Sequence, residues 1–229
     1  MPARRLTAIL ALLCLLPIGC TQVQTDTTLR IDRPVRPEDY TETVRVACIG
    51  DSITFGSSIP DRDADSYPAQ LQRMLGDRWN VQNFGVSGAT MLRQSNLPYW
   101  QRDTFRRAMA FRPHVVLIKL GTNDSKSHWS ADAFRRDYAD MVDVFAALDT
   151  APRIWLCLPV PAYEIKWEIR PEVVRDEVIP IIEDIAKQKD LPLIDLYTAL
   201  DNAEPLFPDK IHPNAEGARR MAAAIDRAL

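Results

Sequence analysis

Short apolar runs alternate with amphipathic segments along most of this chain, and this alternation constrains the fold more than any other feature of the sequence. Continuous apolar runs of this length are typical of strands buried on both faces of a sheet. The runs are Val44–Ile49, Asn80–Phe84, Val115–Leu120, Arg153–Leu158 and Pro192–Leu196. Strands that alternate with helices predict a parallel sheet covered by helices on both sides.

The connections between these runs carry helical patterns. Apolar residues within 134–148 recur every three or four positions, which predicts a helix with Ser130 as its N-cap. Segment 174–185 repeats the pattern, and Pro180 is expected to kink that helix. A last helix is expected to begin near Asn214. We therefore expect a three-layer α/β/α, flavodoxin-like domain with about five parallel strands in the order 2-1-3-4-5.

Composition excludes several other classes of protein. The chain has 229 residues, of which 46% are hydrophobic and 26% are charged, as in ordinary globular domains. Disorder, collagen and coiled coil are therefore excluded as the main architecture. The net charge of −3 provides no basic field for nucleic acid, so no nucleic-acid partner is expected.

The amino terminus has the pattern of a targeting segment. Arg4 and Arg5 precede the nearly apolar run Leu6–Ile18. That run suits a secretory signal peptide and is shorter than the ~20 residues that span a bilayer. Residues 1–19 are therefore expected to be a signal peptide, and the protein is expected to be exported.

A cysteine follows the apolar run directly. Pro17-Ile18-Gly19-Cys20 resembles the bacterial lipobox, which implies a lipid on Cys20 and a membrane-anchored, periplasmic or cell-surface lipoprotein. An ordinary signal peptide with a chance cysteine is the alternative. No helical or strand period persists after Cys20, so residues 20–42 are expected to be a flexible tether and 43–229 the folded domain.

Glycine-containing polar motifs follow the predicted strands. In parallel sheets, ligands bind at the carboxyl ends of the strands, where these motifs are expected to meet. The motifs are Gly50-Asp51-Ser52, Gly85-Val86-Ser87-Gly88, Gly121-Thr122-Asn123-Asp124 and, before the last helix, Asp209-Lys210-Ile211-His212.

Only three histidines are candidates for a catalytic base. His114 precedes its strand and is expected at the opposite end of the sheet, whereas His128 lies in a polar loop on the correct side. His212 follows Asp209 by three residues, a spacing that places both side chains on one face of a turn. Asp209 could then hold the Nδ1 proton while Nε2 faces a hydroxyl group. A turn followed by a helix N-cap is the alternative interpretation.

In this order, Gly50-Asp51-Ser52, Gly88, Gly121-x-Asn123-Asp124 and Asp209-x-x-His212 resemble the SGNH hydrolases, also called the GDSL esterase/lipase family. The resemblance implies that Ser52 is the nucleophile, His212 its base and Asp209 the residue that orients the base. It also implies an oxyanion hole formed by Gly88, Asn123 and the N–H of Ser52.

Three further polar residues of these motifs, Ser87, Asp51 and Asp124, are candidates for a nucleophile or for metal ligands. Ser87 is a weaker nucleophile candidate, because Ala89 stands where a nucleophile elbow needs glycine. Asp51 and Asp124 are interpreted as turn or helix caps. No second histidine lies near His212 in the sequence, so neither a metal nor another cofactor is expected.

Four aromatic or histidine side chains and two cysteines lie in or near the predicted strands and their loops. Substrate contacts are expected from His128, Trp129, Tyr163 and Trp167. Packing is the alternative role for these side chains. Cys48 and Cys157 are expected to be free buried thiols, because the predicted strand order places a strand between them.

The wider spelling of the motifs suggests a substrate. Lys119–Asp124 and Phe207-Pro208-Asp209-x-Ile211-His212-Pro213-Asn214 resemble bacterial acetylxylan esterases and sialate O-acetylesterases. This resemblance implies removal of acetyl groups from carbohydrates, with an acetylated sugar as the partner. An SGNH lysophospholipase, thioesterase or acyltransferase is one alternative, and a non-catalytic glycan-binding lipoprotein is another.

Overall fold

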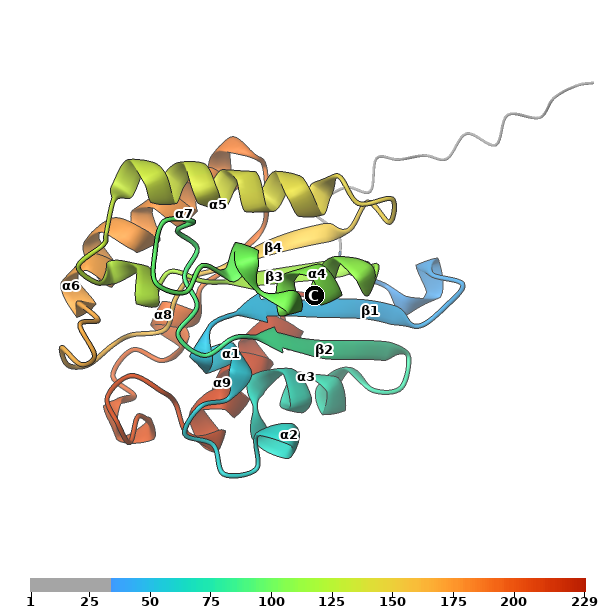
Figure 1. Cartoon of the computed structure of the whole chain (residues 1–229). Coiled ribbons are helices and arrows are strands. Elements are labelled where there is room, and N and C mark those ends of the chain that lie inside the picture. Colours follow the sequence, from blue (N-terminus) through green and yellow to red (C-terminus); the bar gives the residue numbers. More distant parts are fainter. Residues whose placement is uncertain (1–33) are drawn as a thin grey trace, which may run out of the picture. The chain divides into compact units, whose positions relative to one another are not determined.

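A computed structural model describes residues 34–229 and contains one five-stranded parallel sheet (Figure 1). The strand order is β2-β1-β3-β4-β5, which confirms the predicted flavodoxin-like order. All neighbouring strands pair in parallel. The strands are β1 (Val44–Gly50), β2 (Trp79–Gly85), β3 (Val115–Lys119), β4 (Arg153–Cys157) and β5 (Leu193–Ile194).

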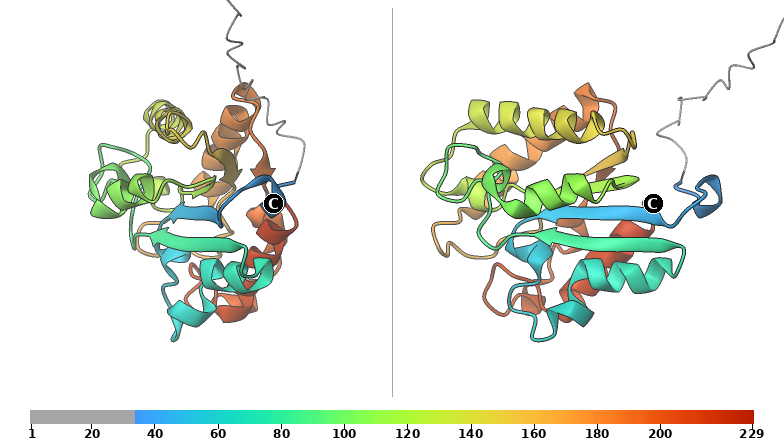
Figure 2. Two further views of the ribbon diagram at one scale, coloured as in Figure 1. Left: turned by 90° about the vertical axis from the view of Figure 1, so that its right-hand side faces the viewer. Right: turned by 45° about the vertical axis from the view of Figure 1, so that its right-hand side comes forward.

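Helices fill the connections between the strands. They are α1 (Ser52–Phe55), α2 (Arg62–Asp65), α3 (Tyr67–Leu75), α4 (Asp103–Ala110), α5 (Ala131–Ala146), α6 (Pro171–Val173), α7 (Ile179–Gln188), α8 (Leu196–Ala199) and α9 (Ala215–Asp226). Helices α3 and α9 cover one face of the sheet, and α4, α5 and α7 cover the other (Figures 1 and 2).

Alternation along β1 shows how the sheet separates two cores. Ala47 and Ile49 point into the core beneath α4, α5 and α7. Val46 and Cys48 point into the core beneath α3 and α9. Successive strand residues face opposite sides of a sheet, so a continuous apolar run buries both faces. This explains why the predicted strands lack a polar alternation.

Helix starts differ in detail from the prediction. Helix α5 begins after Ser130, which is its N-cap residue as predicted, although the side chain of Ser130 makes no capping hydrogen bond. The predicted kinked helix is interrupted by a π-helical turn, Val174–Val178, with Pro180 in the first turn of α7. Proline lacks the N–H that a continuous helix needs there. Helix α9 follows Asn214, whose Oδ1 accepts a hydrogen bond from the Gly217 N–H at 3.0 Å.

The segment 34–42 is packed against the domain, which corrects its assignment to the tether. Val35 is only 6% exposed, and its N–H donates to the carbonyl of Leu229. The ring of Tyr40 lies 4.9 Å from that of His114. The folded domain therefore includes residue 34 onward, because these side chains lose apolar surface to the core.

The predictions for residues 1–33 lie outside the described residues; they concern the signal peptide, Cys20 and most of the tether. Among residues 34–229, no helix is both long and apolar enough to cross a membrane.

Cys48 and Cys157 are both free and buried. They lie on β1 and β4, which are separated by β3, as the predicted strand order required. Burial raises the pKa of both thiols far above the usual range, so both stay protonated and unreactive at neutral pH.

Candidate functional site

Four loops at the carboxyl end of the sheet surround one cleft of about 410 Å³. They follow β1, β2 and β3 or precede α9, and Figure 1 shows these strands ending on the same side of the domain. The loop after β4 adds two more residues. The cleft is lined by Ser52, Ser57, Ser58, Ser87, Gly88, Asn123, Lys126, Trp167, Ile169, Asp209 and His212.

A chain of hydrogen bonds joins three of these side chains. His212 Nε2 lies 2.8 Å from Ser52 Oγ, and His212 Nδ1 lies 2.8 Å from Asp209 Oδ2. With Nδ1 protonated, the ring donates to the carboxylate and its Nε2 accepts from the serine hydroxyl. The structure thus brings together the three residues that the sequence motifs singled out, with His212 between Ser52 and Asp209.

Asp209 accepts hydrogen bonds on both carboxylate oxygens. Oδ1 accepts from the backbone N–H groups of Ile211 and His212, and Oδ2 accepts from the His212 ring and from Ser58 Oγ at 2.9 Å. Partial burial by itself would raise the pKa of Asp209, but these hydrogen bonds lower it to about 2. Asp209 is therefore a carboxylate at neutral pH and can accept a hydrogen bond from the proton that His212 carries on Nδ1.

Backbone N–H groups beside Ser52 are available to a ligand. Within residues 34–229, neither the Ser52 N–H nor the Gly88 N–H donates a hydrogen bond to another protein group. Gly88 has a φ of +78°, a left-handed conformation that glycine adopts without strain. The Asn123 amide donates one N–H to the carbonyl of Ala89 at 3.1 Å, which leaves its second N–H for the cleft. These are the three predicted oxyanion-hole residues.

A buried ion pair joins the end of β3 to the loop that carries Ser52. Lys119 Nζ lies 3.1 Å from both carboxylate oxygens of Asp51, and both side chains are fully buried. Asp51 also accepts from the Ile53 N–H at 2.9 Å, so it caps α1 as predicted. Burial lowers the pKa of Lys119 although the Asp51 carboxylate raises it. The burial of Lys119 was not predicted, because a lysine at the end of a buried strand usually reaches solvent.

The strand exits approach one another too closely for a side chain at Gly50. A Cβ there would meet Thr54 Oγ1 at 2.0 Å and the backbone carbonyl of Lys119 at 2.8 Å. Glycine at this position therefore allows the chain to pass from β1 into α1 in close contact with the end of β3. This passage places Ser52 in the lining of the cleft.

Asp124 joins the loops after β2 and β3. Its carboxylate accepts from the backbone N–H groups of Met91 and Leu92 at 3.0 and 2.8 Å. It therefore ties two loops together and does not cap its own turn, which corrects its predicted role. Burial raises the pKa of Asp124 to about 7, although these two hydrogen bonds oppose that change.

One of the four predicted substrate contacts lies in the cleft. Trp167 is 52% exposed, and its ring centroid lies 5.5 Å from that of His212. His128, Trp129 and Tyr163 do not line the cleft, so the structure corrects those predictions.

The other two aromatic side chains have structural partners. The indole N–H of Trp129 donates to Glu177 at 2.6 Å, and its ring packs on Phe134. The hydroxyl of Tyr163 donates to the carbonyl of Leu200, and its ring packs on Phe207. Residue type alone could not separate these packing roles from a role at the cleft, because both bury an aromatic face.

Ser87 also lines the cleft, but it has no base. Its hydroxyl lies 3.3 Å from that of Ser57, and among the described residues no histidine contacts it. Lys126 and Ile169 line the cleft and were not predicted, because no motif surrounds them. Within residues 34–229, no group of three His, Cys, Asp or Glu side chains could hold a metal ion.

Comparison with known proteins agrees with this geometry. The model of the GDSL-like Lipase/Acylhydrolase family matches residues 48–220, which include every cleft residue described above. The fold is an α/β domain built on a parallel sheet, with the cleft at the carboxyl ends of the strands. The chain belongs to the GDSL-like lipase/acylhydrolase family, a family of carboxylic ester hydrolases.

A curated relative and solved structures agree with this assignment. The chain is 42% identical over 213 residues to an acetylxylan esterase of Xylanibacter ruminicola, covering 84% of this chain and 44% of that protein. It therefore spans less than half the length of this relative.

Two solved structures share the fold. A G-D-S-L family lipolytic protein from Desulfitobacterium hafniense matches with a TM-score of 0.64 and 25% identity, covering 81% of this chain and 99% of that one. Est24, a carbohydrate acetylesterase from Sinorhizobium meliloti, matches with a TM-score of 0.64 and 20% identity, covering 80% and 97%.

Proposed function

We propose that this chain is a serine esterase that removes small acyl groups, chiefly O-acetyl groups, from carbohydrates. The observation that carries this proposal is the hydrogen-bonded series Ser52–His212–Asp209. It lines one cleft with Gly88, and within residues 34–229 the N–H groups of Ser52 and Gly88 have no protein acceptor. The names of two relatives, an acetylxylan esterase and a carbohydrate acetylesterase, support the substrate class.

The first half of the reaction forms an acyl-enzyme. His212 Nε2 takes the proton of Ser52 Oγ as that oxygen attacks the ester carbonyl carbon. The carbonyl oxygen becomes negatively charged and accepts hydrogen bonds from Ser52 N–H, Gly88 N–H and the Asn123 amide. His212 then donates the proton to the leaving alcohol, so the acyl–oxygen bond breaks and the acyl group stays on Ser52.

The second half releases the acid. His212 removes a proton from water, the resulting hydroxide attacks the acyl carbon, and Ser52 leaves with the proton returned by His212. Throughout both halves, the Asp209 carboxylate holds the imidazole in one tautomer and stabilises its positive charge. The low pKa of Asp209 keeps this carboxylate ionised in the working pH range.

The test compares hydrolysis of 4-nitrophenyl acetate and 4-nitrophenyl octanoate by the wild type, Ser52→Ala and Ser87→Ala. We expect turnover of acetate over octanoate, a loss of about 10⁶-fold in kcat for Ser52→Ala, and retained activity for Ser87→Ala. Circular dichroism should show that both variants are folded. A preference for octanoate would favour a lipid or thioester substrate, and no Ser52-dependent turnover of either ester would favour a binding protein.

We further propose that residues 1–19 direct export and that Cys20 carries a lipid anchor. The basic start and the apolar run before Cys20 support this. Expression of the whole chain in a bacterium should give a membrane-bound, lipid-modified protein, and Cys20→Ser should move it to the soluble fraction. An unmodified Cys20 would leave a simple signal peptide.

A further inference from the structure

The charged side chains that line the cleft differ in whether they already have partners. Asp209 is the carboxylate that lines it, and both of its oxygens are already occupied by hydrogen bonds. Lys126 also lines the cleft, and within residues 34–229 no carboxylate lies within ion-pair distance of its ammonium group. The chain as a whole carries a net charge of −3, so this free cation in the cleft opposes the overall sign.

Trp167 lies beside the proposed base in the same cleft. Its ring contacts that of His212, with centroids 5.5 Å apart and an angle of 45° between the planes. The leaving alcohol must approach His212 Nε2 to receive its proton. The Lys166 ammonium lies 4.8 Å from the centroid of the Trp167 ring, so one face of the indole already carries a cation. A sugar that carries this alcohol oxygen is therefore placed against the rest of the exposed indole, which suits the apolar face of a pyranose ring.

The turn that carries Trp167 is held in a strained backbone conformation. Trp167 and Glu168 have φ values of +50° and +64°, and the Ile169 N–H donates to the Lys166 carbonyl at 2.9 Å. Two successive positive φ angles are characteristic of a type I′ turn, in which glycine or asparagine is usual. Backbone strain of this kind persists where the surroundings hold it and gathers at functional sites.

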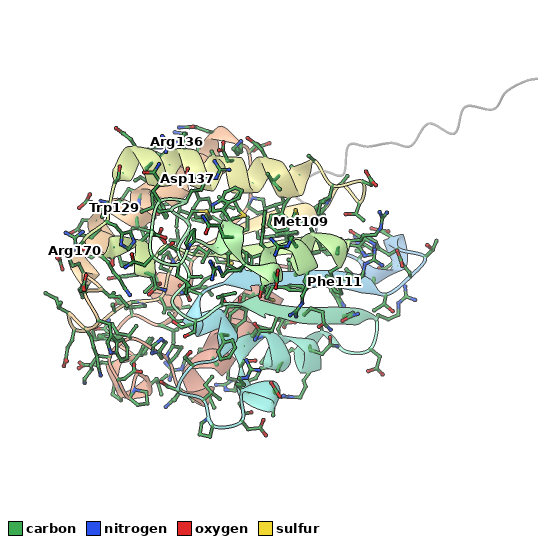
Figure 3. All side chains as sticks on the ribbon, in the orientation of Figure 1. Met109, Phe111, Trp129, Arg136, Asp137 and Arg170 are labelled. Carbon is green, nitrogen blue, oxygen red and sulfur yellow. The ribbon has the colours of Figure 1, made fainter. Side chains whose placement is uncertain are left out.

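Arg170 joins this turn to the loop that carries Lys126. Its guanidinium donates to the carbonyl of Lys126 at 2.9 Å, and its N–H donates to Ser125 Oγ at 3.1 Å. Ser127 adds a hydrogen bond to Glu168 at 3.2 Å. Figure 3 shows Arg170 at the end of the domain where Trp129 also lies. The ammonium and the indole are thus presented by two loops that are fastened together.

We propose that Lys126 and Trp167 form a leaving-group subsite for an acylated sugar that carries a carboxylate, of the uronic acid class. The indole face holds the ring, and the Lys126 ammonium pairs with the carboxylate. Three further serine hydroxyls in the cleft, those of Ser57, Ser58 and Ser87, can meet sugar hydroxyls. This inference rests on the proposed esterase function and names its substrate class.

The experiment uses two sugars that differ in one charge. They are methyl 2,3,4-tri-O-acetyl-β-D-glucopyranosiduronic acid and its neutral uronamide, and the measurement is the initial rate of acetate release by the full-length chain. We expect kcat/KM for the acid to exceed that for the amide by up to about fivefold, the range of a solvent-exposed ion pair. This ratio should fall as salt is added, because salt screens the charge.

Two lysine variants test the assignment. Lys126→Met should reduce the ratio to about one, whereas Lys187→Met, on the exposed side of α7, should keep it. Trp167→Ala should lower kcat/KM for both sugars by the same factor and leave the ratio unchanged.

Three outcomes would overturn a proposal, and they are distinguishable. Equal rates on both sugars, or a ratio that survives Lys126→Met, would remove the carboxylate subsite. Ser52-dependent hydrolysis of 4-nitrophenyl acetate without hydrolysis of either sugar would remove the whole sugar subsite and leave the esterase proposal standing. No Ser52-dependent hydrolysis of any of the three would overturn the esterase function itself.

Discussion

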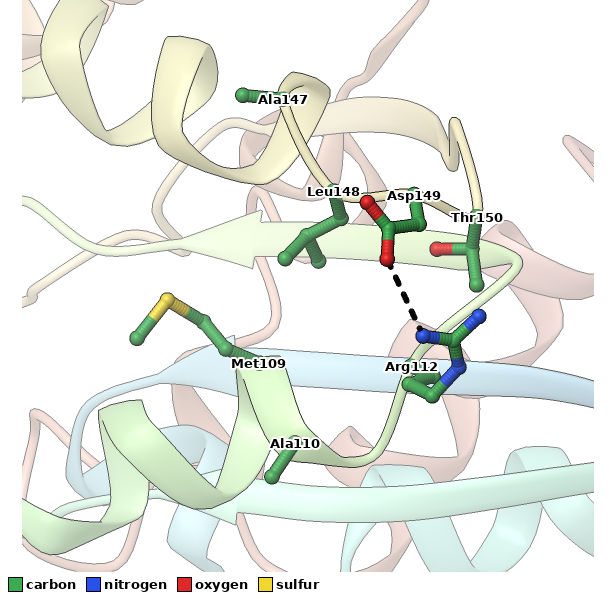
Figure 4. Close-up of a pocket in the computed structure, with 7 residues that line it drawn as sticks. All are labelled: Met109, Ala110, Arg112, Ala147, Leu148, Asp149 and Thr150. Carbon is green, nitrogen blue, oxygen red and sulfur yellow. Dashed lines mark hydrogen bonds and ion pairs between the residues drawn. The ribbon is translucent and has the colours of Figure 1, made fainter.

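The two ends of the sheet carry clefts of almost the same volume, about 410 Å³ at the carboxyl end and about 400 Å³ at the amino end. The amino-end cleft lies between the ends of α4 and α5 (Figure 4) and is crossed by an ion pair between Arg112 and Asp149 at 3.5 Å. It is lined by Met109, Ala110, Arg112, Ala147, Leu148, Asp149 and Thr150. No nucleophile there meets a base. Volume alone therefore does not mark a reactive site.

The histidines at the two ends show the same contrast. At the amino end, both ring nitrogens of His114 contact Arg45, at 3.1 and 3.0 Å, and Glu42 lies 3.3 Å from the ring. Burial and the Arg45 charge lower the pKa of His114, which has no nucleophile to serve. At the carboxyl end, His212 has a hydroxyl on one nitrogen and a carboxylate on the other. The partners, not the imidazole, distinguish the two ends.

Among the variants that test this contrast, Asp209→Asn is expected to cause the largest loss of kcat. The imidazole loses its tautomer control and the support for its positive charge, so kcat should fall by about 10⁴-fold. The matched control is Asp149→Asn in the amino-end cleft, which should leave kcat within twofold. Steady-state hydrolysis of 4-nitrophenyl acetate measures both. If the two variants had equal rates, Asp209 would be only a turn cap.

A second contrast lies between a buried and an exposed lysine. Lys119→Met leaves Asp51 as an unpaired buried carboxylate and should reduce the free energy of unfolding by about 3–5 kcal/mol. The control is Lys189→Met, which breaks a partly exposed pair with Asp143 and should change the free energy by at most about 1 kcal/mol. Denaturant unfolding measures both, and equal losses would show that the Asp51–Lys119 pair has no special weight.

Asn123→Ala removes one proposed oxyanion donor. We expect kcat to fall by about 10²–10³-fold, because the developing charge loses one preorganised hydrogen bond. Asn80→Ala, at the start of β2 and therefore at the other end of the sheet, should have no effect on kcat. An unchanged KM for Asn123→Ala would place the loss in the transition state, whereas a rise in KM alone would contradict the assignment.

The smallest effect concerns two aspartates at the carboxyl end with opposite pKa shifts. The pKa of Asp209 is lowered to about 2, so its contribution to stability is present above pH ~4 and is lost as the pH falls toward 2. The pKa of Asp124 is raised to about 7, so the contribution of Asp124 to stability is fully present below pH ~4 and is lost as the pH rises through 7.

Denaturant unfolding as a function of pH separates these two contributions. Asp124→Asn should flatten the decline in unfolding free energy between pH 4 and 7, and Asp209→Asn should flatten the change below pH 4. A decline between pH 4 and 7 that is unchanged in Asp124→Asn would assign it to other groups.

Patterns that are local in the chain were enough to predict the fold class and those parts of the site that lie within one turn or loop. Continuous apolar runs predict β1 and β3 because a strand buried on both faces has no polar side. Asp209 and His212 could be paired from the sequence because they are three positions apart in one turn. Strand β5 was predicted too long, since only Leu193–Ile194 finds a ladder partner on β4.

The tertiary structure alone decided the contacts between distant segments. Ser52 and His212 are 160 residues apart, and their 2.8 Å contact exists only because the strand order places both loops at one edge of the sheet. The ion pair of Lys119 with Asp51 and the hydrogen bond from Arg170 to the carbonyl of Lys126 likewise depend on the tertiary structure. A side chain's neighbours across the fold depend on packing of the whole core, whereas the patterns that predict strands and helices are local. The sequence therefore named the groups of the site, and the packing of the sheet decided which of them meet.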